Sequence, residues 1–283
     1  MKEIDQVLAC RETEPGFLEC SLNLTRIFET GNERQLFDSK WKEFLDSDCY
    51  HKKLFKLTGN RLTYKTEQLI PTKSNEKPPI LLVFGNPAGR SVVEGMFFAF
   101  ERDNKEHRFW KQILECSGVV DFGFNNTLPV EKKNEQRKKH ILALKYKSRF
   151  RIGLSVFISI PSKASGPWSG VGGVQKLIGA KAMRKLEDAE KNRITEISDN
   201  FLNDKGAVLT FQKNAWEALR SAGDPEYTIS KAKSGRLKGS LNDRPGITLI
   251  GLPPTRLVGP CRRVMHKALL EKGSRSCKGS SYT

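Results

Sequence analysis

The chain has 283 residues, with 49 Lys and Arg, 32 Asp and Glu, and a mean hydropathy of -0.50. This length suits two domains of ~150 residues or one elaborated α/β domain. No run approaches the ~18 apolar residues of a spanning helix, and the acidic N-terminus is unlike a secretion signal. These features exclude an integral membrane protein, and we expect an intracellular one, in the cytoplasm, nucleoid or nucleus.

The first 78 residues are electrically neutral, with 13 basic and 13 acidic side chains. They contain the amphipathic stretch Phe37–Leu45 and end in the polar, proline-bearing stretch Pro71–Pro79. We therefore predict a helical N-terminal extension and linker over 1–78, followed by a second domain over 79–283.

Six cysteines are scattered along the chain, and no two of them form a Cys-x-x-Cys pair. This arrangement predicts neither a zinc ribbon nor a disulfide framework, and we expect ordinary reduced thiols. The six are Cys10, Cys20, Cys49, Cys116, Cys261 and Cys277.

Short apolar runs that are followed by turn or helix signals predict buried strands at Ile80–Gly85, Ile152–Ile160, Ala207–Phe211 and Ile247–Leu252. Helical patterns predict helices at Asn104–Cys116, Gln175–Asn203 with some interruption, Asn214–Ser221 and Pro260–Lys272. This alternation predicts a three-layer α/β/α sandwich with a central, mainly parallel four-stranded sheet. Ligands of such sheets bind beyond the carboxyl ends of the strands, in loops that begin here at Asn86, Pro161, Gln212 and Pro253.

The positive charge gathers in residues 79–283, which hold 36 basic and 19 acidic side chains. Residues 129–151 contain nine Lys or Arg, and residues 231–238 contain four with no acid. Such clusters suit the neutralisation of phosphates and predict a polyanionic partner. A solvated, lysine-rich surface is the alternative.

A Gly-rich segment over 166–173 lacks the Lys-Ser/Thr ending of a P-loop and the spacing of a dinucleotide fingerprint. We interpret it as a mobile loop beside the substrate or as a plain connector. A nucleotide-binding α/β enzyme that uses this segment is a further hypothesis.

The segment Phe84–Lys111 contains Asn86-Pro87, then Ser91, then Gly95-Met96-Phe97-Phe98, and finally Arg108-Phe109-Trp110-Lys111. In order and spacing it resembles the first motif of the uracil-DNA glycosylase superfamily, particularly its mismatch-specific and thymine-DNA glycosylase branch. Gly153-Leu154-Ser155, running on to Pro161-Ser162, and the late Pro253-Pro254-Thr255-Arg256-Leu257 resemble two further family motifs. The resemblance covers residues 80–270.

The resemblance implies a monofunctional DNA glycosylase of base-excision repair, with Asn86 holding the attacking water. It implies substrate contacts at Gly85, Ser91, Gly95, Phe98 and Ser155, with Phe98 as the stacking ring. A neutral amide is not a strong base, so modest turnover is expected. The alternatives are that Asn86 is only a turn residue and that Phe98 is only core packing.

The late motif implies a DNA-binding loop in which Leu257 is the wedge that fills the gap left by the extruded base. Arg256 suits a phosphate or the orphaned base. Thr255 suits a phosphate or a turn cap. Leu257 buried under the following helix is the alternative.

Two departures from the family pattern leave the substrate open. Val156 stands where several branches carry an Asn or a basic residue, and Pro253 replaces a His. Uracil opposite guanine is the first expectation, followed by hypoxanthine and xanthine. A catalytically inactive nucleic-acid-binding protein with the same fold is the alternative. We expect a monomer that binds double-stranded DNA with a damaged or mismatched base, without metal or cofactor.

Overall fold

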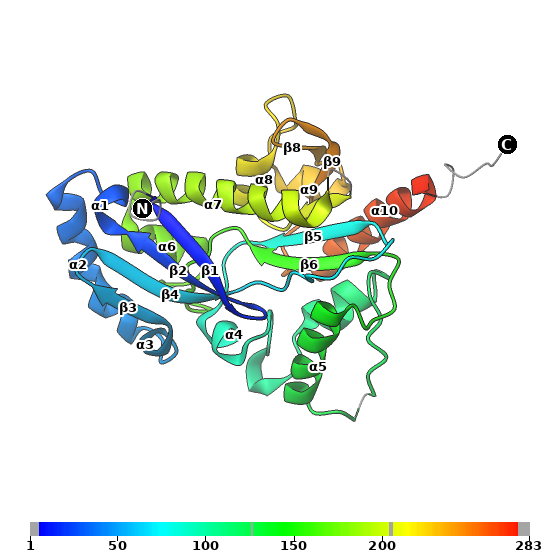
Figure 1. Ribbon diagram of the computed structural model, residues 1–283, viewed down its shortest axis with the longest axis horizontal. Coiled ribbons are helices and arrows are strands. Elements are labelled where there is room, and N and C mark those ends of the chain that lie inside the picture. The colour runs from blue at the N-terminus through cyan, green and yellow to red at the C-terminus, as the bar shows by residue number, and fades with distance from the viewer. Residues whose placement is uncertain (1–5, 126, 204–205, 277–283) are drawn as a thin grey trace. The chain divides into compact units, whose positions relative to one another are not determined.

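The computed structural model describes residues 6–125, 127–203 and 206–276 (Figure 1). The chain forms two compact units, and each is assembled from three separate stretches. Unit 1 comprises residues 6–69, 84–99 and 154–197. Unit 2 comprises the described residues of 70–83, 100–153 and 198–276. The division predicted near residue 78 stays a prediction.

Unit 1 contains a four-stranded antiparallel sheet, made of β1 (Leu8–Glu14), β2 (Phe17–Asn23), β3 (Phe55–Thr58) and β4 (Arg61–Glu67) in the order β1-β2-β4-β3 (Figure 1). The helical character predicted for residues 1–78 is therefore wrong for these four strands. Leu18, Cys20 and Leu22 of β2 are buried at every second position, which is the period of a strand with one buried face.

The helices of unit 1 are α1 (Leu24–Ile27), α2 (Gly31–Asp46), α3 (His51–Leu54), α4 (Gly89–Glu94), α6 (Gly170–Ile178) and most of α7 (Ala180–Leu202). Helix α2 contains the predicted amphipathic stretch. It begins with a capping box between Thr30 and Glu33, and it buries Phe37 and Phe44. The predicted interruption of the later helix falls at Gly179, which separates α6 from α7.

The second sheet has five strands in the order β6-β5-β7-β9-β8: β5 (Pro79–Phe84), β6 (Arg151–Val156), β7 (Ala207–Thr210), β8 (Lys238–Leu241) and β9 (Arg244–Gly251). The mixed α/β class and the four predicted strands are confirmed. The predicted strand number is wrong, because β8 adds an antiparallel edge to β9. Its hairpin turn uses Asn242 and Asp243, both at positive φ, as short hairpins require.

The other pairings of this sheet are parallel. Strands β5 and β7, and β7 and β9, pair in parallel register. Hydrogen bonds from Arg151 N to Pro78 O and from Phe157 N to Phe84 O advance together along β6 and β5, so this pair is parallel too. Every residue of β5, β6 and β7 is buried, as expected of strands covered on both faces. The chain passes from β5 to β6 on one side and then to β7 on the other, so the strand order reverses at β5 and β7.

The helices of unit 2 are η1 (Arg102–Asn104), η2 (Phe109–Glu115), α5 (Val130–Ala143), α8 (Lys213–Leu219), α9 (Ile229–Ser234) and α10 (Val258–Ser276). The helix predicted over 104–116 is a π-helix, η2, that starts five residues late. Asp103 and Asn104 have positive φ, which breaks a helix before residue 109. Among the described residues, no helix has the length and apolar character needed to cross a membrane.

Candidate functional site

The segment after β5 is held by main-chain hydrogen bonds to the segment after β6. Ile158 N donates to Gly85 O at 2.7 Å, and Ser162 N donates to Pro87 O at 3.0 Å. Gly89 N returns a bond to Ser162 O at 2.9 Å. The Asn-Pro turn is thus fixed from both sides by a second stretch of the chain, all within unit 1.

Both donated hydrogen bonds of the Asn86 amide hold its orientation. Nδ2 donates to Ile160 O at 3.2 Å and to Ser162 Oγ at 2.8 Å. Because a carbonyl oxygen only accepts, the nitrogen and not the oxygen must face Ile160. The side chain is half-buried, and its Oδ1 has no hydrogen-bond partner among the described residues. A carbonyl oxygen in this state can accept a hydrogen bond from water.

Phe98 is half-buried and has a φ of 50°, which is unusual for a bulky residue. Its ring lies edge-on to that of Phe84, with the centroids 4.9 Å apart and the planes at 83°. A left-handed Phe costs of order 1 kcal/mol and is found mainly where the surrounding structure imposes it. The alternative of a fully buried core residue does not describe Phe98.

Ser91 and Gly95 shape the turn that leads to Phe98. Ser91 lies in α4 and is 9% exposed, and its carbonyl accepts hydrogen bonds from Gly95 N and Met96 N. Gly95 ends α4 with a φ of 71°, a conformation that favours glycine. The structure therefore gives both residues a positioning role in the backbone, and their substrate contacts stay predictions.

The predicted substrate residue Ser155 lies in the interior of unit 1. It is fully buried, and its hydroxyl accepts a hydrogen bond from Arg193 at 3.4 Å. Val156 beside it is 1% exposed, and Gly85 is buried as well. A ligand does not reach the Ser155 hydroxyl in this conformation, so its proposed contact stays a prediction.

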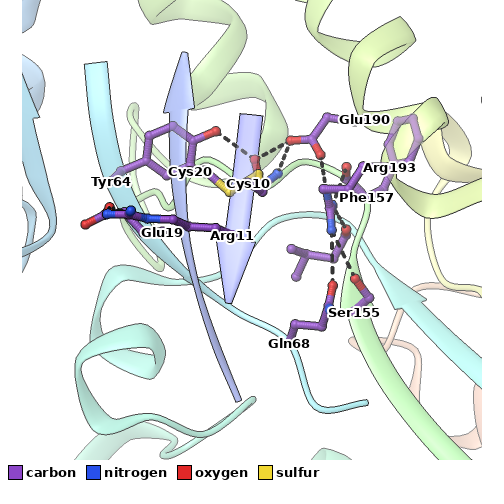
Figure 2. The surroundings of a disulfide bond; sticks show 12 residues. Cys10, Arg11, Glu19, Cys20, Tyr64, Gln68, Ser155, Phe157, Glu190 and Arg193 are labelled. Atoms are coloured by element: carbon purple, nitrogen blue, oxygen red, sulfur yellow. Dashed lines mark hydrogen bonds and ion pairs between the residues drawn. A yellow bond between two sulfur atoms is a disulfide. The ribbon is translucent and has the colours of Figure 1, made fainter. Parts of the chain in front are cut away.

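A buried polar network, which sequence reasoning missed, supports the segment that holds Asn86 (Figure 2). Glu190 is fully buried and accepts hydrogen bonds from the Ser159 amide and hydroxyl. Tyr64 Oη bonds the same hydroxyl at 2.7 Å, and Arg193 pairs with Glu190 at 2.6 Å. Burial, with the nearby Glu190, raises the pKa of Tyr64. The network fixes the chain just before Ile160.

The sequence contains only a weak signal for this network. Glu190 and Arg193 stand three apart in α7, which is the spacing of an ordinary surface ion pair. Only the Ser-rich end of the β6 run, which places Ser159 among apolar residues, hinted at a buried polar group.

Cys10 and Cys20 form a disulfide across the paired strands β1 and β2, with their Cα atoms 4.1 Å apart (Figure 2). The expectation of reduced thiols is therefore wrong for this pair, because strand pairing brings the two side chains together. Cys49, Cys116 and Cys261 are free, and burial raises the pKa of Cys261 to about 12. Cys277 lies outside the described residues.

The disulfide borders a cavity of about 530 Å³ within unit 1. Residues 6–10 line one side, and α7 lines the other with charged and amide side chains that include Lys185, Asp188, Asn192 and Arg193. Both signs of charge are present, so the lining does not select one class of ligand.

The predicted DNA-binding loop lies in unit 2, between β9 and α10. Leu257 N donates to Pro254 O at 2.8 Å, and Leu257 O accepts from Cys261 N at 2.9 Å. Arg256 is exposed, and Leu257 and Thr255 are half-exposed. Leu257 is therefore not buried under α10. Pro253 is buried, so it presents nothing polar at the surface.

Part of the basic cluster over 129–151 belongs to the core, which corrects its interpretation as a phosphate-binding surface. Lys133 and Arg137 are buried and form ion pairs with Glu106. Arg137 also lies over the ring of Trp110, 5.1 Å from its centroid. Desolvation acts to raise the pKa of Glu106, but the hydrogen bond and charge of Arg137 outweigh it and lower that pKa. Arg151 is buried as well and donates to a main-chain carbonyl.

The second half of the Gly-rich segment over 166–173 is the start of a helix. Residues 170–173 form the first turn of α6, so the predicted loop is wrong for them. A Cβ on Gly173 would lie 2.4 Å from the carbonyl oxygen of Trp168, which explains the glycine by close backbone approach. Trp168 itself donates to Glu43 at 3.0 Å.

Within the described ranges, no three His, Cys, Asp or Glu side chains gather as a metal site would require. The two carboxylates near the first motif are accounted for: Glu94 is exposed, and Glu101 pairs with Arg108. No protein-family model matches the chain, and no curated protein sequence matches it.

Proposed function

We propose that the chain is a monofunctional DNA glycosylase that excises uracil or another deaminated base in base-excision repair. The observation that carries the proposal is the amide of Asn86, whose nitrogen donates to two acceptors and whose oxygen has no hydrogen-bond partner among the described residues. Asn86 stands two residues after the end of β5, and β5 lies where the strand order reverses. Open parallel sheets bind their ligands beyond the strand ends at such a reversal.

The proposed chemistry fits an amide at this position. Cleavage of the N-glycosidic bond passes through a sugar with oxocarbenium character, and water then adds to C1′. Asn86 Oδ1 would accept a hydrogen bond from that water and fix its direction. An amide takes no proton at neutral pH, so the contribution is positioning and not base catalysis.

Two further features support base extrusion from a duplex. Phe98 presents a half-exposed aromatic ring, held by Phe84, on which an extruded base could stack. Leu257 is a half-exposed apolar side chain beside the exposed cation Arg256, which suits a wedge with a phosphate contact. The proposal includes a three-layer arrangement with helices on both faces of the five-stranded sheet, a location in the nucleoid or nucleus, and a monomeric state.

The test is alkali cleavage of labelled duplexes that contain uracil, hypoxanthine, xanthine or mismatched thymine. We expect cleavage of at least one, and a loss of at least ~10²-fold for Asn86→Ala, the scale of one preorganised group. Asn75→Ala is the matched control, because Asn75 is exposed and makes only a local bond to the amide of Lys77. Wild-type rates for Asn86→Ala on every cleaved base would remove Asn86 from the mechanism.

A catalytically inactive nucleic-acid-binding protein is the second candidate, favoured by the burial of Val156 and Pro253. Neither residue can give a polar contact to a base. This candidate predicts salt-sensitive DNA binding with no base release from the whole panel of duplexes. The same cleavage assay therefore separates the two.

A further inference from the structure

A groove of about 350 Å³ lies in unit 2 between α9, the start of β8 and α10. Its floor is apolar and is formed by Ile250, Val264 and Ala268, each less than a tenth exposed. The groove is separate from the Asn86 turn in the chain and shares no residue with it.

The walls of this groove carry cations from two sides. Lys233 and Lys238 stand on one wall, Arg263 and Lys267 stand on the other, and all four are exposed. None of the described residues that line the groove is acidic. The composition therefore selects an anion, in contrast to the mixed lining of the cavity beside the disulfide.

The C-terminal end of α9, beside the groove, is partly capped by the residues that follow it. Gly235 N donates to Ala232 O, and Arg236 N donates to Lys231 O. These carbonyls belong to the negative end of the helix, and their oxygens are satisfied by these hydrogen bonds.

The spacing on α10 suits a repeating anion. Arg263 and Lys267 are four residues apart and share one face of the helix, about 6 Å apart along its axis. A nucleic-acid strand carries one phosphate per ~3.4 Å of its axis, so two cations at this interval can pair with one strand. The apolar floor between the walls gives a surface for the sugars, and a flat membrane could not enter a concave groove.

We propose that this groove binds the phosphodiester backbone of a nucleic acid through Arg263 and Lys267 on one wall and Lys233 and Lys238 on the other. The inference goes beyond base excision, because backbone binding needs no damaged base. It assigns a partner contact to the second basic cluster of the sequence and to two residues of α10 outside that cluster.

The experiment measures binding of the full chain to an undamaged labelled duplex over a range of salt concentrations. The double variant Arg263→Gln/Lys267→Gln should weaken binding by roughly tenfold and lower the salt slope by about 2, since each lost phosphate contact lowers it by about 0.9. Lys53→Gln/Lys56→Gln is the matched control: both lysines are exposed in unit 1, and their loss changes the net charge equally. This control should leave the slope near the wild-type value.

A second measurement needs no variant. Lysine acetylation followed by mass spectrometry should show protection of Lys233, Lys238 and Lys267 by the duplex, relative to Lys53 and Lys56. Equal slopes for the two double variants together with no protection would overturn the proposal. So would binding to anionic lipid vesicles that depends on Arg263 and Lys267 while duplex binding does not. Because the duplex is undamaged, failure of base excision leaves this result unaffected.

Discussion

The amide nitrogen of Asn86 donates to the hydroxyl of Ser162, 76 residues later in the chain, at 2.8 Å. Ser162 is 1% exposed, and its own main chain is bonded to Pro87 and Gly89 on either side of the same turn. The position of the segment after β6 therefore directly sets the orientation of the Asn86 amide. Orientation of the proposed water-holding group depends on this one side-chain contact and on Ile160 O.

Replacing Ser162 by alanine should reduce kcat for base release by roughly tenfold, with KM nearly unchanged. The loss of one hydrogen bond is worth about 1 kcal/mol, and a rotated amide no longer directs the water. Single-turnover kinetics on the preferred duplex measure the effect. Ser169→Ala is the control, because the Ser169 hydroxyl donates to the nearby Gly166 O at the surface. An unchanged kcat for Ser162→Ala would show that Ile160 O alone orients the amide.

Replacing Glu106 by alanine should lower the free energy of unfolding by about 3 kcal/mol. The change leaves the buried Arg137 without its carboxylate, and an uncompensated buried charge is costly. Glu135 is the matched control, since it also pairs with two cations, Lys132 and Lys139, but at the surface. Glu135→Ala should cost less than ~1 kcal/mol. Equal losses in urea unfolding would contradict the buried network.

The stability of the protein should fall as the pH drops from about 6.5 towards 4, partly because of His107. Burial lowers the pKa of His107 to about 4, and its Nδ1 accepts a hydrogen bond from Phe109 N at 3.1 Å. As the pH falls, His107 is protonated in the unfolded chain before it is protonated in the folded protein. The His107 contribution to stability is therefore lost between about pH 6.5 and 4, and it does not change further below pH 4. The contribution is at most about 3 kcal/mol.

The measurement is urea unfolding at pH 7 and at pH 4.5 for the wild type and His107→Gln. The variant has no imidazole to protonate, so it should lose less stability between the two pH values. A pH dependence identical to that of the wild type would assign the titration to other groups, among which His51 also has a pKa lowered by burial.

The Cys10–Cys20 disulfide should stabilise the protein by about 2 kcal/mol, because it closes a short loop in the unfolded chain. Cys10→Ala/Cys20→Ala should show this loss, and reductant should bring the wild type to the same level. Cys49→Ser, at an exposed free thiol, should have no effect. Trypsin cleaves after Arg11, so a non-reduced digest should contain two peptides joined through these cysteines. Unlinked peptides would contradict the bond.

The second sheet was predictable from the sequence because its strands are buried on both faces. Continuous apolar runs such as Ile80–Gly85 carry that signal directly. Strand β8 was not predictable in this way, since Lys-Gly-Ser-Leu has neither an apolar run nor an alternation. The antiparallel sheet of unit 1 was missed for a different reason. Its strands mix charged residues with alternating apolar ones, and the whole region was interpreted as helical because of the amphipathic stretch in α2.

The Asn86 turn was predictable because Asn-Pro ends an apolar run, whereas the support for it was not. Glu190, Ser159 and Tyr64 lie far apart in the sequence, and their burial follows from tertiary packing that no local pattern records. The basic cluster over 129–151 shows the opposite error. The density of charge suggested a surface, but the fold buries Arg137 against the Glu106 carboxylate and the Trp110 ring.

Unit 1 is assembled from three separate stretches of the chain, and this limits how the protein can be shortened. The part that carries Asn86 also includes residues 6–69, and Tyr64 reaches the Ser159 hydroxyl from that early stretch. A fragment that begins at residue 79 would lack all four strands of the antiparallel sheet and the Tyr64 hydroxyl that bonds Ser159. Expression trials should therefore keep the early region, because an inactive truncation would not test the activity proposed for the full chain.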